Sequence, residues 1–348
     1  MKKYLLLLSS VLAALSACSR TDTLPTPDPE PIRIVVDVDG ALSTRATDVT
    51  AQNGRNDSAD EAAVGSLQVF VFNGEALDGY GSSTGSKAAT VSCTAGEREV
   101  WAVVNAGPLS SVTSRAGLLR QVASLGSGPS DFGMIGSTTA TLRSEGRVGV
   151  TVSRHAARVV IRGIRNALGN AAQAADFKIL SVYLTNVAGD VDFGHSSLYT
   201  VSAWYNKRGY QASNSLGPAA YDAVNASVEA GATYSTPHFF YSMPNGNEGK
   251  VGGAWSPRAC RLVIRAQIAG VVYDYPILLP ALEGNRSYEI GLVTITRAGN
   301  LDDGREPDDD RPDDDDEEKP VVGFEQGFDI SVNDWTVVLV DGTGNITI

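Results

Sequence analysis

The chain of 348 residues is poor in the side chains that most often build catalytic and metal centres. It has three histidines and three cysteines, and aromatic residues make up 7% of it. His155, His195 and His238 lie far apart in sequence, with no pair at metal-ligand spacing. The sequence also lacks G-x-S-x-G, a glycine-rich phosphate loop and H-E-x-x-H. We therefore predict no enzyme, no cofactor and no metal, and we expect His155 to pack against a strand.

Basic residues are scarce as well. The formal net charge is −12, and residues 302–319 hold twelve acidic and three basic side chains, which is nine of those negative charges. The rest of the chain is only mildly acidic and has no basic footprint, so nucleic acid is excluded as a partner. The run 302–319 also contains prolines, which indicates a solvated acidic insert rather than a cation cage.

One apolar run stands at the N-terminus, and it is too short to span a bilayer. Lys2 and Lys3 precede it, and it ends in small residues directly before Cys18. This order is similar to a bacterial lipoprotein signal, in which residues 1–17 are removed and the Cys18 thiol carries lipid. Cys93 and Cys260 remain, and the exported compartment would permit a disulfide between them. The sequence leaves open whether they pair or are two buried thiols.

Periodicity predicts a chain built mainly of strands. In "PIRIVVDVDGAL", Ile32, Ile34, Val36 and Val38 share one face, which is typical of a half-buried strand. Ten further segments also have strand character, and those from 176 to 299 are rich in β-branched or aromatic residues and end in Gly, Pro or Asn. They are 66–74, 87–93, 98–107, 145–164, 176–189, 238–245, 260–270, 271–280, 286–299 and 328–348. Helical spacing over 109–128 predicts the main helix.

This pattern indicates an all-β fold with one or two short helices. Strands at this spacing favour two β-sandwich-like domains in series. We place the boundary near residue 165, which gives domains 46–165 and 166–348 after a lipidated propeptide, 18–45.

Several motifs in order make the chain resemble the fimbrillin family of type V pili. They are the lipoprotein signal, "STRA", "LQVFVFNGE", "VWAVVNAG", "SRHAARVVIRGI", "FKILSVYLTNVAG", "HFFYSMPN", "RSYEIGLVTIT" and "VNDWTVVLV". They extend over nearly the whole chain. The resemblance implies transthyretin-like, Greek-key sandwiches and a non-enzymatic shaft or tip subunit that supports adhesion.

The resemblance also implies how such a subunit assembles. An arginine-specific surface protease would cut between Arg45 and Ala46, with Arg55 as the alternative. The first strand would leave with the lipid anchor, taking Ile32, Ile34, Val36 and Val38 out of their groove. A C-terminal segment of another subunit, within 328–348, would replace it. Two donor stretches remain open: Trp335, Val337, Val338, Leu339 and Val340, or Ile346 and Ile348.

Several partners and alternatives follow. The precursor would sit in the outer membrane through its lipid and then join other pilus subunits in a surface fimbrium, with a host or bacterial receptor that the sequence does not identify. Asp57-Ser58-Ala59 resembles the D-S/T-apolar O-glycosylation signal of the bacteria that carry the fimbrillin family, which would make Ser58 a glycosylation site. An anchor subunit would instead keep its first strand and lipid. A different class is a monomeric lipoprotein that binds glycans through aromatic side chains: Trp204, Tyr205 and Trp255.

Overall fold

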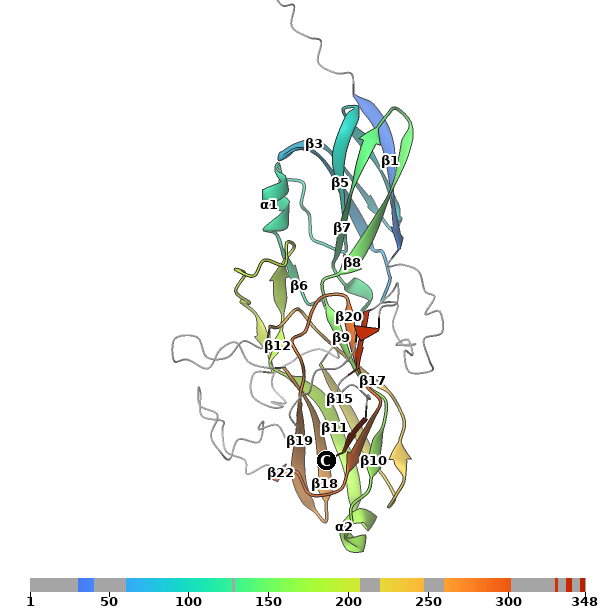
Figure 1. The fold of residues 1–348 in the computed structure, drawn as a ribbon, viewed down its shortest axis with the longest axis vertical. Helices are drawn as coiled ribbons and strands as arrows, with labels where there is room; N and C mark the ends of the chain where they lie inside the picture. The colour runs from blue at the N-terminus through green and yellow to red at the C-terminus, as the bar shows by residue number, and fades with distance from the viewer. Residues whose placement is uncertain are drawn as a thin grey trace, which may run out of the picture. The chain divides into compact units, whose positions relative to one another are not determined.

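The computed structural model describes most of the chain after residue 30. The described residues are 31–40, 61–126, 129–206, 220–246, 260–301, 329–330, 336–339 and 345–347. Strands make up most of the coloured ribbon in Figure 1, with short helices beside them. The predicted all-β class with short helices is therefore confirmed. Among the described residues, no helix is both long and apolar enough to cross a membrane.

The first sandwich is built from a seven-stranded sheet with the strand order β3-β2-β5-β7-β8-β1-β4. Its strands are β1 (Ile32–Gly40), β2 (Ser66–Asn73), β3 (Ala76–Thr84), β4 (Ala88–Cys93), β5 (Gly96–Val104), β7 (Met134–Leu142) and β8 (Gly146–Arg154). β7 and β8 pair only through Met134–Ile135 and Ser153–Arg154, so the sheet turns a corner there. The inward-facing residues of both halves form one apolar core.

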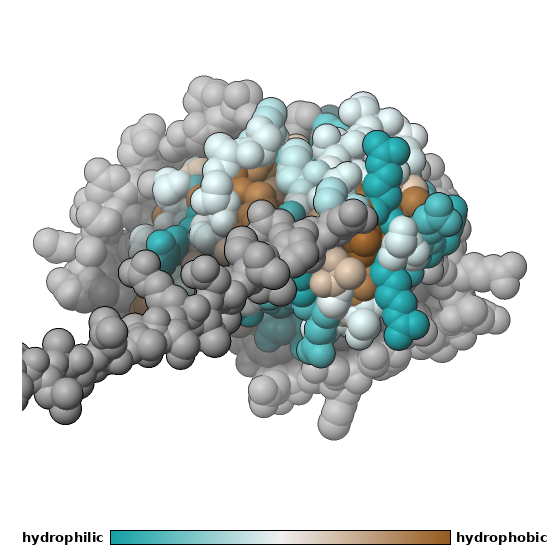
Figure 2. Space-filling model, turned by 90° about the horizontal axis from the view of Figure 1, so that it is seen from above, coloured by the Kyte–Doolittle hydropathy of each residue, from teal (hydrophilic) through white to brown (hydrophobic). Residues whose placement is uncertain are grey.

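β1 lies inside this sheet and not at its edge. It pairs antiparallel with β4 and parallel with β8. Ile34, Val36 and Val38 are buried in the core, while Val35 on the other face is half-buried. The alternation in the sequence thus corresponds to one core-facing side of the strand. Seen from above, the coloured residues are mostly teal and white, with brown apolar atoms between them (Figure 2).

Two glycines bring β3 against β4. A Cβ atom on Gly79 would lie 2.5 Å from the carbonyl oxygen of Ser92, and one on Gly81 would overlap the carbonyl of Thr90. Only glycine permits so close a backbone approach. β4 is therefore held on one side by β1 and supported on the other by β3.

The second sandwich has one five-stranded sheet on one side, in the order β15-β11-β18-β19-β22. These strands are β15 (Tyr221–Ser227), β11 (Phe177–Thr185), β18 (Arg261–Ile268), β19 (Val271–Leu278) and β22 (Asn300–Leu301). Helix α2 (Ala171–Ala175) precedes β11 and is capped by the Asn170 side chain. The apolar faces of this sheet contribute to a second core, which extends from Ala157 to Ile346.

The opposite side consists of two sheets, β17-β9-β20-β24-β23 and β16-β10-β21-β25. The bounds are β9 (Ala157–Ile161), β10 (Ile164–Asn166), β16 (Thr233–Tyr234), β17 (His238–Ser242), β20 (Arg286–Ile290), β21 (Leu292–Ile295), β23 (Asp329–Ile330), β24 (Thr336–Leu339) and β25 (Asn345–Thr347). β20 runs parallel to β9 and β24, and β21 runs parallel to β10 and β25. The red C-terminal strands thus lie beside the orange β20–β21 segment (Figure 1).

A third apolar cluster joins residues from distant parts of the chain. It includes Phe70 and Phe72 of β2, Leu118, Val191 and Tyr241. Four short strands lie around it in two pairs: β6 (Val122–Ser124) with β13 (Asp190–Asp192), and β12 (Val187–Ala188) with β14 (Trp204–Tyr205). The contacts of Pro31–Ile348 place both sandwiches in one compact unit. The limits 46–165 and 166–348 therefore stay predictions.

The expectation of a main helix over 109–128 is wrong. Helix α1 spans only Arg115–Leu119, with the Ser114 side chain accepting from the Gly117 amide at its start. A short 3₁₀ helix follows later, at Pro129–Asp131. Between them the chain forms β6, which pairs with β13 and leaves Val122 exposed. Tertiary strand pairing outweighs the helical spacing here, because Gly117 and the β-branched Val122 make the helix weak.

The two internal cysteines do not form a disulfide. Cys93 is buried in the first core and Cys260 in the second, and both are free thiols. Burial raises the pKa of the Cys260 thiol to about 12, and it also raises the pKa of Cys93. Both therefore stay protonated and unreactive at neutral pH.

The two faces of β1 give a direct test of its role in the core. We expect Val36→Ala to lower the free energy of unfolding by about 2–3 kcal/mol, because it removes two buried methyl groups and leaves a cavity. Val35→Ala is the matched control on the other face, and its cost should stay below about 1 kcal/mol. Urea unfolding followed by circular dichroism measures both. Equal losses for the two variants would contradict this orientation of the strand.

Candidate functional site

Many residues named for processing and donation fall outside the described part of the chain. These are Cys18, Arg45, Ala46, Arg55, Ser58, Trp255, Trp335, Val340 and Ile348. Val337, Val338 and Leu339 are placed in β24, although their side chains are not described. The described residues nevertheless include the first strand, β1, its two neighbours β4 and β8, and the residues that follow position 60.

β1 fills a slot whose walls are β4 and β8. Beyond the ladders, the Val38 amide donates to the Lys87 carbonyl at 2.9 Å, and the Arg33 carbonyl accepts from the Glu145 amide at 2.9 Å. At the surface, Arg147 and Asp37 form an ion pair at 2.8 Å. Such an exposed pair adds little stability. The strand is held mainly by its backbone ladders and its buried side chains.

β4 has attachments that do not depend on β1. The Asp78 carboxylate on β3 accepts from the Thr94 amide at 3.0 Å, directly after β4. The same carboxylate pairs with the Arg98 guanidinium at 2.8 Å, and Arg98 lies on β5. Arg98 and Thr94 together hold the pKa of Asp78 below its usual value, against the opposing effect of burial. Together with the contacts of Gly79 and Gly81, this clamp fixes one wall of the slot.

Glu61 is the first described residue after the segment 41–60, and it is buried. Its carboxylate pairs with Arg158 at 2.9 Å and accepts from the Tyr241 hydroxyl at 2.5 Å. Its carbonyl accepts from Arg154 at 2.9 Å. The chain is therefore anchored inside the protein directly after the segment that contains Arg45 and Arg55.

The anchor continues as a buried network towards the C-terminal strands. Arg158 on β9 also donates to Ser287 at 2.8 Å, and Arg162 pairs with Glu289 at 2.8 Å. Ser287 and Glu289 belong to β20, and Glu289 lies opposite Leu339 of β24 in the register. Sequence spacing alone could not reveal this network, because Glu61 and Tyr241 are 180 positions apart.

The C-terminal strands are paired within their own chain. β24 lies between β20 and β23, and β25 lies at the edge beside β21. Ile346 is 3% exposed and belongs to the second core. Of the two proposed donor stretches, the structure thus describes one side chain, and that side chain is buried.

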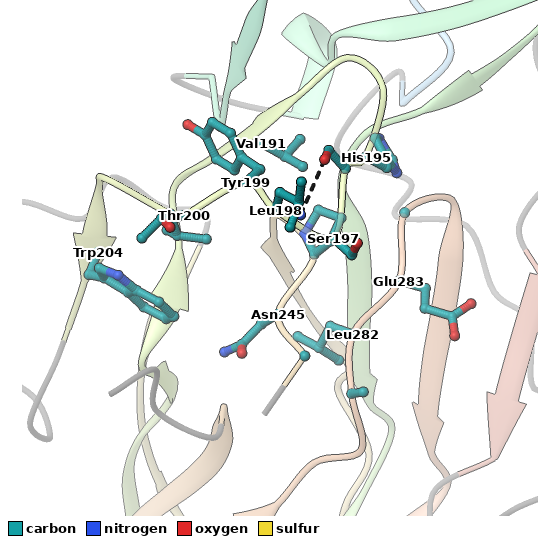
Figure 3. Close-up of a pocket in the computed structure, with 16 residues that line it drawn as sticks. Val191, His195, Ser197, Leu198, Tyr199, Thr200, Trp204, Asn245, Leu282 and Glu283 are labelled. Carbon is teal, nitrogen blue, oxygen red and sulfur yellow. Dashed lines mark hydrogen bonds between the residues drawn. The ribbon is translucent and has the colours of Figure 1, made fainter. Parts of the chain in front are cut away.

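A pocket lies in a different part of the molecule and was not foreseen from the sequence. Its cavity of about 870 Å³ is lined by Val191, by residues 195–201, by Trp204 and by residues 244–246 and 281–284. Trp204 belongs to this lining, whereas Tyr205 packs against the second core. Figure 3 shows the Trp204 ring and the Asn245 side chain directed into the space between them. Of the three aromatic residues proposed as stacking platforms, the described residues bring only Trp204 to a cavity.

Two histidines that are distant in sequence meet at the edge of this pocket. Nδ1 of His155 lies 2.8 Å from Nε2 of His195, and the His155 ring stacks on Phe193. Burial lowers the pKa of His155 to about 3, and His195 nearby adds to this effect. Burial also lowers the pKa of His195, although Asp192 opposes that change. The pair is thus neutral at pH 7, with one ring donating to the other.

Within the part of the chain that the structure describes, no group of three or more His, Cys, Asp or Glu side chains could hold a metal ion. Asp222, His238 and Tyr234 form a hydrogen-bonded row, with His238 2.7 Å from Asp222 and 3.0 Å from Tyr234. His238 is buried on β17, and this row links β15, β16 and β17. We assign it a structural role.

The region from β1 to β9 matches a known protein family. Residues 32–161, less than half of the chain, match the family described as major fimbrial subunit protein (FimA). The predicted resemblance to fimbrillins is confirmed by that match, and the family is one of fimbrial subunits rather than enzymes. Its members belong to cell-surface fimbriae.

Solved structures extend the likeness in fold to most of the chain. A proposed cell adhesion protein from Bacteroides eggerthii is 18% identical with a TM-score of 0.60, covering 91% of this chain and 98% of its own. The fimbrilin FimA from Porphyromonas gingivalis is 14% identical with a TM-score of 0.53, covering 77% of this chain and 91% of its own. No curated protein matches the sequence significantly.

The Glu61 anchor predicts a large cost for losing one charge. We expect Glu61→Gln to lower the free energy of unfolding by about 3–5 kcal/mol, because the buried charge of Arg158 would keep only its longer contact to Glu289, at 3.5 Å. Glu75→Gln, which removes an exposed partner of Arg115, is the matched control and should leave the urea midpoint nearly unchanged. A midpoint for Glu61→Gln equal to that of the control would contradict a buried anchor.

His155 predicts a loss of stability in mild acid. In the unfolded chain His155 binds a proton near pH 6.5, whereas the folded chain keeps it neutral down to about pH 3. Stability therefore falls as the pH drops below about 6.5, by roughly 2 kcal/mol between pH 6.5 and pH 5. Urea unfolding at both pH values should show this fall in the wild type and a smaller fall in His155→Gln. An unchanged pH dependence in the variant would assign the effect to other groups.

Proposed function

We propose that the chain is a shaft or tip subunit of a type V fimbrium, exported as a lipoprotein and polymerised by donor-strand exchange. The observation that carries the proposal is the position of β1. It is an internal strand with a core-facing apolar side, and the segment 41–60 separates it from the Glu61 anchor. A cut after Arg45 would divide the chain between these two fixed points.

Removal of β1 would leave a slot with exposed apolar side chains and unpaired backbone groups, and one wall of the slot would keep its position. Three buried side chains, Ile34, Val36 and Val38, would leave the core, at roughly 1.5–3 kcal/mol each before entropy. The backbone edges of β4 and β8 would lose their partners. β4 would stay in place through Asp78 and the glycines of β3, so the slot would keep one wall. A replacement strand would regain most of the apolar burial and the backbone hydrogen bonds that β1 had contributed.

The C-terminal strands have the right direction for such a replacement. A strand in the slot must run parallel to β8, as β1 does. β24 and β25 already run parallel to their neighbours β20 and β21 in this chain. Residues 336–339 and 345–347 therefore pair with a parallel neighbour, as β1 does with β8, which supports the C-terminal segment as the donor.

The arrangement also accounts for a precursor that stays monomeric. Its own β1 fills the acceptor slot, and its own sandwich holds the donor strands. Cleavage by an arginine-specific surface protease would empty the slot. The empty slot of one subunit would then compete with the second sandwich of a neighbouring subunit for that neighbour's donor strands. The lipidated precursor would reside in the outer membrane, and the mature subunit in the surface fimbrium. An anchor subunit, by contrast, would retain β1.

Cleavage of the precursor in vitro tests this function. The precursor in detergent is treated with an arginine-specific protease, then examined by N-terminal sequencing and by gels run unboiled and boiled. We expect a new N-terminus at Ala46 and a ladder that collapses on boiling. Arg45→Ala should remain uncut and monomeric, while the matched Arg55→Ala should assemble. A deletion of 336–348 should be cut but should not polymerise.

Two results would change the proposal. Assembly by Arg45→Ala but not by Arg55→Ala would move the cut to Arg55 and keep strand exchange. A wild-type chain that is cut at Ala46, loses β1 and still remains a monomer would refute polymerisation through this slot.

A further inference from the structure

The pocket around Trp204 is separate from the slot of β1 and from the C-terminal strands. None of its lining residues belongs to β1, β4, β8, β24 or β25. Its volume of about 870 Å³ falls within the range of small-molecule sites, about 300–1,000 Å³. Strand exchange therefore leaves this cavity without a role.

Two buried carboxylates hold the loop that forms one wall. Asp192 accepts from the Ser196 amide at 2.7 Å, and Asp190 accepts from the Ser202 and Ala203 amides at 2.9 and 3.0 Å. Both aspartates lie on β13, and both are buried. The loop 193–203 is thus fixed at its two ends by β13. A wall held in this way lowers the entropy cost of binding.

The opposite wall is held by backbone contacts. The Asn245 amide donates to the Leu282 carbonyl at 2.9 Å, and the Leu282 amide donates back at 2.8 Å. The Asn245 side chain donates to the Asn186 carbonyl at 3.2 Å. At Gly284 a Cβ atom would lie 2.8 Å from the His155 carbonyl oxygen, so this position requires glycine. Both walls are therefore preformed.

The lining combines apolar surface with hydroxyl and amide groups. Trp204 and Leu198 supply the apolar part, and Leu198 is 90% exposed, so it stands free beside the cavity. Ser197, Thr200 and Asn245 supply the polar part (Figure 3). Among the described lining residues there is no Lys or Arg, and the one carboxylate, Glu283, pairs with Arg286 at 2.5 Å. Such a lining offers no cation to a phosphate or carboxylate ligand.

We propose that this pocket binds one or two sugar units of a neutral carbohydrate. The C–H face of a sugar ring packs on the electron-rich face of an indole, and its hydroxyls bond to amides and hydroxyls. Trp204 and Leu198 would contact the apolar face, and Ser197, Thr200 and Asn245, which line the same cavity, would meet the hydroxyls. The proposal does not depend on strand exchange.

Isothermal titration calorimetry of the full chain tests the site. The probes are lactose, maltose and chitobiose, with inorganic phosphate as the charged comparison, in a detergent that carries no sugar. The variants are Trp204→Phe, which keeps most of the packing, and Leu198→Ser. Their matched controls are Trp101→Phe and Leu301→Ser, and Leu301 is also exposed but lies on β22. Arg45→Ala is included to separate this site from assembly.

We expect at least one disaccharide to give a saturable heat of binding, with an affinity that Trp204→Phe and Leu198→Ser each weaken by about tenfold or more. The two controls and Arg45→Ala should bind like the wild type, and phosphate should not bind. The proposal is overturned if no disaccharide binds up to roughly 50 mM, a range that includes weak sites. Binding that both pocket variants leave unchanged would also overturn it, as would binding of phosphate alone.

Discussion

The insertion of β1 between β4 and β8 is the constraint on which the other features depend. Its buried side chains complete the first core, so the sandwich is closed only while some strand lies in that position. The surrounding structure is arranged around this fact. β4 is fixed to β3 by two glycines and by Asp78, and the chain after residue 60 is fixed separately at Glu61. β1 is thus separated from the Glu61 anchor by the segment 41–60.

The two sandwiches use parallel strands in the same way. β1 lies parallel to β8 in the first, and β24 and β25 lie parallel to β20 and β21 in the second. The buried network of Glu61, Arg158 and Glu289 connects the first described residue after the segment 41–60 to β9 and β20 of the second sandwich. Charges buried at this depth tolerate little displacement, because each loses its partner when the others move.

The sequence predicted the features that depend on residues close together in the chain. The alternation of 32–38 predicted the core-facing side of β1, and the β-branched segments predicted most strands of both sandwiches. It failed over 109–128, where pairing of β6 with β13 outweighs helical spacing. The pocket, the His155–His195 pair and the Glu61 network could not be predicted, because each joins side chains that are far apart in sequence. Trp204 had no local signal that distinguished it from Tyr205, which lies next to it and faces the core.

The register of β1 has a mechanical consequence. It pairs with β4 at six positions and with β8 at seven, on both of its edges at once. A force directed along a strand in this slot loads both ladders in shear, so many hydrogen bonds must break together. A force directed sideways would instead peel the strand from one end. In a filament whose subunits are joined through such slots, tension along the strands would load each joint in shear. This is the direction in which the joint resists rupture best.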